Sequence, residues 1–188
     1  MHTLLGVFIA SSVGFVATMF DNLFAFAAQL LITEPAKIRR VSWAQASAVA
    51  MLVVLAAGVG SLLAGIPLRW VGILCLAPWA LAAHAWRHGD QARTQQVRRG
   101  ALTTFTITLA LGGDNLAVWI PLLRANGVGR SLVTILTFAL WEWLFVVGAQ
   151  RLTRRPQVVE WGTRHARSMV PWIYLGLGIL ILIECGSL

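Results

Sequence analysis

The chain has 188 residues, of which 58% are hydrophobic and only 12% are charged, and its mean hydropathy is +0.75. This composition excludes a soluble globular protein and indicates an integral membrane protein. The formal net charge is +8. Because the basic residues are dispersed over three loops, we expect membrane lipid headgroups as their partners and no nucleic acid.

Six apolar stretches follow one another, each near the roughly 20 residues that a helix needs to cross the hydrocarbon layer. They cover residues 4–32, 42–65, 67–87, 101–123, 128–150 and 168–186. The runs are continuous and lack the alternation of a membrane β-barrel, so helices are the consistent choice. We therefore predict an all-α integral membrane protein with six transmembrane helices.

Two short motifs each occur twice at the same offset of 93 residues, which is close to half the chain. Asp21-Asn22-Leu23 returns as Asp114-Asn115-Leu116, and Pro78-Trp79 returns as Pro171-Trp172. The pattern indicates one three-helix unit used twice. Because each unit has an odd number of spans, the second copy enters the membrane in the opposite sense.

The domains predicted from this repeat are a first three-helix repeat over 1–87, a cytoplasmic linker over 88–99 and a second, inverted repeat over 100–188. Loop charge supports the orientation. The loops after spans one, three and five hold twelve of the fifteen Lys and Arg residues. Since basic loops stay in the cytoplasm, we place both termini outside and the protein in the cytoplasmic (inner) membrane as a multi-pass protein.

Four carboxylates lie inside the predicted spans: Asp21, Asp114, Glu142 and Glu184. A charge at the centre of a membrane costs at least about 2.5–3.5 kcal/mol on insertion scales, so such residues rarely face lipid. Asp21 and Asp114 are related by the repeat. We expect them to mark a functional site at the interface of the two halves.

The sequence around each of these aspartates forms helix poorly, with Gly112-Gly113 before one and Thr18 before the other. We predict a helix break at both places. Backbone carbonyls freed there would join the oxygens of Asp21, Asn22, Asp114, Asn115 and Thr18 in an oxygen-rich site for a cation. The alternative is that Asp and Asn simply cap interrupted helices.

Glu142 lies in the fifth span between two tryptophans, and the repeat-related position 49 is Val. It can serve as a metal ligand or as a proton carrier. The alternative is a structural ion pair or hydrogen bond with Arg124, Gln150 or a cytoplasmic arginine. Trp119 and Trp141 lie deep in their spans, where they can close a pathway.

Four segments of the chain carry a resemblance to a known family. They are Gly112 to Asn115 followed by Pro121, Thr18 to Asn22, Leu140-Trp141, and the final run from Pro171 to Glu184. Together they resemble the cadmium resistance transporter (CadD-like) family, which belongs with the LysE-type exporter superfamily. The resemblance covers essentially the whole chain and implies heavy-metal efflux across the cytoplasmic membrane.

One position departs from the family pattern. The first motif of the family carries Asn two residues before its Asp, whereas this chain has Met19 there. A thioether that points inward would soften the site and favour Cd²⁺ over Mg²⁺, but Met19 can also face a neighbouring helix as packing. Cys75 is a further candidate for a soft ligand, and His84 with His88 for metal capture.

We predict an efflux transporter for a divalent heavy-metal cation, with Cd²⁺ as the first candidate, that works by alternating access and proton antiport. The metal is the substrate, and no cofactor or catalytic residue is predicted. An exporter of an amino acid or another organic cation is the alternative. An enzyme is disfavoured because the loops are short. Small-residue faces at Gly58, Gly60 and Gly65 leave a homodimer open.

Overall fold

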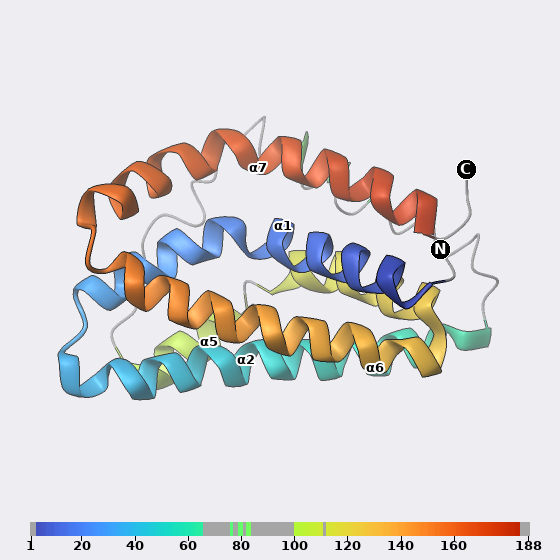
Figure 1. Ribbon diagram of the computed structural model, residues 1–188, viewed down its shortest axis with the longest axis horizontal. Helices are drawn as coiled ribbons and strands as arrows, with labels where there is room; N and C mark the ends of the chain where they lie inside the picture. The colour runs from blue at the N-terminus through green and yellow to red at the C-terminus, as the bar shows by residue number, and fades with distance from the viewer. Residues whose placement is uncertain are drawn as a thin grey trace.

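The computed structural model describes residues 3–65, 76, 79, 80, 82, 83, 100–110 and 112–184. The elements are α1 (Leu4–Leu31), α2 (Pro35–Leu62), a 3-10 turn η1 (Leu63–Gly65), α5 (Ala101–Ala110), α6 (Gly113–Leu152) and α7 (Pro156–Glu184), shown in Figure 1. Every element in these ranges is helical, as the composition and the continuous apolar runs predict. The predicted linker over 88–99 lies outside the described residues, so the domain boundaries remain predictions.

Within the described residues, three helices are long and apolar enough to cross a membrane: α1, α2 and the segment Gly129–Leu152 of α6. Ala101–Ala110 and Gly113–Gly127, bent by 60° at a short break, would together make a fourth span. The chain is therefore a multi-pass membrane protein. The predicted span over 67–87 lies mostly outside the described residues, and the span over 168–186 begins within α7, so the total of six remains a prediction.

The helix α6 is a hairpin of two arms, Gly113–Gly127 and Gly129–Leu152. Gly127 has φ 66° and ψ 172°, a backbone conformation that side chains with a Cβ rarely adopt. Hydrogen bonds then join residues eight apart: the Ser131 hydroxyl donates to the Leu123 carbonyl at 3.2 Å, and Asn126 Nδ2 donates to Thr134 at 2.8 Å. Because the chain folds back, the arms run antiparallel (Figure 1).

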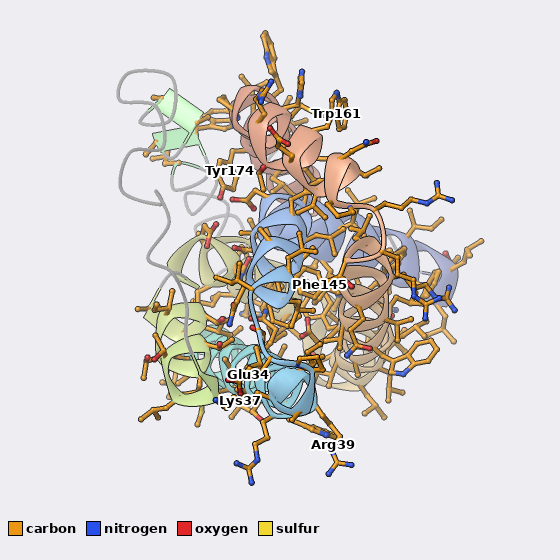
Figure 2. All side chains as sticks on the ribbon, turned by 90° about the vertical axis from the view of Figure 1, so that its left-hand side faces the viewer. Glu34, Lys37, Arg39, Phe145, Trp161 and Tyr174 are labelled. Atoms are coloured by element: carbon orange, nitrogen blue, oxygen red, sulfur yellow. The ribbon has the colours of Figure 1, made fainter. Side chains whose placement is uncertain are left out.

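The helix α1 lies centrally, in contact with both α6 and α7, while α2 contacts α5 and α6 (Figure 1). Figure 2 shows Phe145 of the second α6 arm in the interior of the bundle and Arg39 extending away from it. Large apolar side chains such as Val54, Leu102 and Trp143 are exposed on the outside. This distribution suits a bundle whose surroundings are lipid rather than water.

Among the described residues, several polar side chains pair across helices, most of them buried. The pairs are Gln29 with Thr104 at 2.6 Å, Thr108 with Gln45 at 2.7 Å, Gln150 with Ser42 at 3.0 Å, and Ser11 with Thr134 at 3.0 Å. Such bonds hold membrane helices together because lipid offers polar groups no partner. They join α1, α2, α5 and the second α6 arm into one bundle.

The two predicted helix breaks have different outcomes. Around Gly112-Gly113 the break is confirmed, since α5 ends at Ala110 and α6 begins at Gly113. At Thr18 to Asn22 the prediction is wrong, because α1 runs unbroken from Leu4 to Leu31. The physical reason is that no Gly or Pro follows Gly14 in this helix, and the Thr18 hydroxyl donates back to the Gly14 carbonyl at 3.0 Å within the helix.

Gly112 sits where the backbone of the confirmed break comes closest to α2. A Cβ at this position would overlap the side chain of Leu52, which is itself buried. Gly112→Ala is therefore expected to destabilise the protein by about 1–3 kcal/mol through overpacking. For a chain of this size each kcal/mol lowers Tm by roughly 2–4 °C, so thermal unfolding in detergent provides the measurement.

The matched control is Gly113→Ala, because a Cβ at Gly113 meets nothing within 4 Å. This variant is expected to keep the wild-type Tm or to raise it slightly. Equal Tm values for the two variants would contradict the close approach at Gly112.

Candidate functional site

An aromatic cluster fixes how α1 meets the α6 hairpin. Phe15 stacks on Trp119 of the first arm with ring centroids 5.7 Å apart, and Phe138 of the second arm lies 5.5 Å from Phe15 and 4.8 Å from Trp119. Trp119 is fully buried. The three rings, one from each helical segment, set the register from which the neighbouring residues can be located.

One helical turn beyond Phe15, the buried side chain of Met19 points inward to the same interface. Its sulfur lies 3.6 Å from Asn115 Nδ2 on the first α6 arm and 3.8 Å from Asn22 Nδ2 on α1. The amide nitrogens donate to the sulfur, a weak acceptor. From the sequence, the Met19 side chain could point inward or pack against a neighbouring helix, and the structure shows that it points inward. It contacts both repeat-related asparagines there.

Helical register puts Glu142 at the same level of the bundle as Met19 and Asn115, and we call this level the Met19 layer. Residues four apart lie on one face of a helix, and Glu142 follows Phe138 by four just as Met19 follows Phe15. Asn115 precedes Trp119 by four on the arm that runs the other way. One helical turn from the aromatic cluster, α1 and the two arms of α6 therefore each direct a polar or sulfur-containing side chain toward the interior of the bundle. These side chains are Met19, Asn115 and Glu142.

Three oxygen atoms in this layer have no hydrogen-bond partner among the described residues: Asn115 Oδ1 and both carboxylate oxygens of Glu142. The Glu142 side chain is only 6% exposed. Two of the expected alternative partners have other contacts, since Gln150 Nε2 donates to Ser42 and Arg124 Nε donates to the Leu63 carbonyl at 3.0 Å. Buried acceptors without donors are rare in proteins and suit a positively charged ligand.

Asp114 lies beside this layer in the first turn of α6 and is 5% exposed. Its Oδ1 accepts the backbone N–H of Asn115 at 3.0 Å, and its Oδ2 accepts the hydroxyl of Tyr174 from α7 at 2.5 Å. The positive end of a helix dipole also stabilises a carboxylate there. Asp114 therefore accepts one backbone N–H in the first turn of α6, which is part of the helix-capping alternative described for the sequence.

Asp21 is half-buried on α1. Since Met19 meets Asn115 and the two helices run antiparallel, two further residues along α1 bring the backbone of Asp21 to the level of Gly113. The register therefore places both motifs at the crossing of α1 and the first α6 arm. Asp21 caps no helix end, because α1 continues ten residues past it.

The remaining predicted site residue, Thr18, is buried on α1 and bonds to the Gly14 and Phe15 carbonyls of its own helix. Its oxygen keeps acceptor capacity after donating. Past the Met19 layer, Phe26 stacks on Phe145 with centroids 5.8 Å apart. Aromatic contacts therefore lie on both sides of the polar layer along α1.

Other candidates fall outside the part of the chain that is described: Cys75, His84, His88 and the side chain of Glu184. Tyr174 was missed by the sequence reasoning. The signal in the sequence that could have pointed to Tyr174 is that it is the single tyrosine of the chain and lies within a predicted span.

The donor set is unlike a conventional transition-metal site. Within the described residues no group of three or more His, Cys, Asp and Glu side chains could hold a metal ion. What the layer offers is a thioether, two amides and a carboxylate. A half-turn of either amide exchanges its NH₂ group for its oxygen, which would present hard oxygen beside soft sulfur.

A family model described as "Cadmium resistance transporter" matches residues 15–188. The match covers both DN motifs, all of the layer around Met19, and Tyr174. No curated protein and no solved structure matches the chain.

Glu142→Leu is expected to stabilise the metal-free protein, because it removes a buried carboxyl whose two oxygens have no partner in the described structure. An unsatisfied buried polar group costs about 1–3 kcal/mol. Thermal unfolding in detergent with a chelator measures the change.

The control is Glu160→Leu, because Glu160 is exposed and pairs with Arg164 at 2.9 Å on the surface of α7. Its effect should stay within about 0.5 kcal/mol. A lower Tm for Glu142→Leu than for wild type would show that the Glu142 carboxyl contributes to folding instead of to a site.

Proposed function

The chain belongs to the cadmium resistance transporter family, and we propose that it exports a soft divalent metal ion, with Cd²⁺ first, across the cytoplasmic membrane. The metal ion is the transported substrate, and no resident cofactor is required. The family description names transport, so we assign no catalytic step to the chain.

The observation that carries this proposal is that Met19 Sδ contacts both asparagine amides, while the buried Asn115 Oδ1 and the Glu142 carboxylate at the same helical level have no hydrogen-bond partner among the described residues. Three unpartnered oxygens and a sulfur within reach of two amides suit a cation that accepts both hard and soft ligands. Asp114 and Asp21 each precede the asparagine of their motif in the chain, and two carboxylates would balance the charge of a divalent ion. Thr18 and Asn22 supply further oxygen donors from α1.

Transport would proceed by alternating access between the two inverted halves. The antiparallel crossing of α1 with the first α6 arm supports this mode, because it brings Asp21-Asn22 and Asp114-Asn115 together from equivalent places in the two repeats. With the termini outside, the Phe15 cluster lies outward of the layer and the Phe26–Phe145 pair lies inward. Each aromatic contact would open in turn while the other stays closed.

Coupling to protons is part of the proposal. When the cation leaves outward, Glu142 would take up a proton, and it would release that proton inward before the next cation binds. The absence of hydrogen-bond partners for its oxygens in the described structure supports this role. A buried neutral acid costs far less free energy than a buried, unpaired carboxylate.

Isothermal titration of the detergent-purified protein with Cd²⁺, Zn²⁺ and Mn²⁺ tests the assignment. We expect wild type to bind, with Cd²⁺ bound most tightly, and the Asp21→Asn, Asp114→Asn double variant to lose binding because the charge that balances the ion is gone. The control is Glu160→Gln on exposed Glu160, which should bind as wild type does.

Binding by wild type should also survive an excess of lysine or arginine. Displacement by either amino acid would favour an organic cation exporter on the same scaffold. Wild-type affinity in the double variant would contradict a role of the aspartates in holding the ion. In proteoliposomes, Cd²⁺ flux that moves no protons would overturn the proposed antiport.

A further inference from the structure

A short hydrogen bond connects α7 to Asp114. The Tyr174 hydroxyl donates to Asp114 Oδ2 at 2.5 Å, and both side chains are buried. The bond ties the Asp114 carboxylate to α7.

The second carboxylate oxygen of Asp114 is also held. Oδ1 accepts the Asn115 backbone N–H at 3.0 Å. A carboxylate has about four acceptor positions over its two oxygens. The two donors therefore orient the group from two different elements, α6 and α7.

The two halves of the chain differ at this point. The position 93 residues before Tyr174 is Leu81, whose side chain has no hydroxyl; its placement lies outside the described residues. The repeat that supplies an aspartate to each half thus supplies this tyrosine to one half only. Asp21 and Asp114 are therefore expected to contribute unequally.

We propose that Tyr174 is a positioning residue of the cation site, whose hydroxyl orients the Asp114 carboxylate for the ion and so links α7 to occupancy of the site. The inference rests on the proposed function. Hydrogen-bond partners of ligating carboxylates typically change metal affinity by about 10–100-fold when removed, and Tyr174 should do the same.

Tyr174→Phe tests this, because it keeps the ring and removes only the hydroxyl. Titration with Cd²⁺ should give a Kd raised by about 10–100-fold, as for other outer partners of metal ligands. The matched control is Thr108→Val, which removes another buried hydroxyl that donates across helices, to Gln45 at 2.7 Å, away from the site. Its Kd should equal that of wild type.

A second readout depends on Tyr174 being the single tyrosine. Incorporation of 3-fluorotyrosine gives a protein with one ¹⁹F resonance. That resonance should shift on titration with Cd²⁺, with a midpoint that matches the binding isotherm. In Asp114→Asn it should start from a different position and should not respond to Cd²⁺.

The outcomes separate this inference from the proposed function. Suppose that the wild-type protein binds Cd²⁺. An unchanged Kd in Tyr174→Phe, or an equal rise in Kd in Tyr174→Phe and Thr108→Val, would then overturn the positioning role and leave the proposed function standing. Should Tyr174→Phe not fold, a wild-type ¹⁹F resonance that stays unmoved at saturating Cd²⁺ would overturn it equally. No binding by wild type would overturn both.

Discussion

A polar group inside a membrane bundle must find its partner within the protein, because lipid supplies none. Bonds such as Thr108 to Gln45 and Ser11 to Thr134 meet this requirement between helices. Among the described residues the exceptions are Gln29 Oε1, the indole N–H groups of Trp119 and Trp141, and the oxygens of Asn115 and Glu142, of which the Asn115 and Glu142 oxygens lie in the Met19 layer. Proteins that keep such groups in a core commonly use them for function.

The position of this layer follows from packing. The aromatic contacts among Phe15, Trp119 and Phe138 set the register of three helical segments. That register brings side chains from distant parts of the sequence to one level. A turn at Gly127 is needed for the same reason, since only a hairpin lets the two arms of α6 present Asn115 and Glu142 to the same interior. Core packing thus determines where the candidate ligands meet.

Much of this arrangement can be predicted from the sequence. Continuous apolar runs predict the helices, Gly112-Gly113 predicts the break before Asp114, and the repeated Asp-Asn pair predicts that Asn22 and Asn115 come close, as their shared contact with Met19 shows. The role of these residues in a cation site stays a prediction. The sequence also suggests a helix break at Asp21. This prediction is wrong, because the segment around Asp21 contains no Gly or Pro that would interrupt the helix. The direction of Met19 and the contact of Tyr174 depend on tertiary register, which no local pattern specifies.

X-ray absorption at the cadmium edge, on Cd²⁺-loaded protein, tests the central claim that the Met19 layer holds the ion. We predict a mixed shell of oxygen with one sulfur neighbour, and loss of that sulfur signal in Met19→Leu, because the Met19 sulfur already lies against both asparagine amides. A shell of oxygen and nitrogen alone in wild type, or a sulfur signal that persists unchanged in Met19→Leu, would contradict the account.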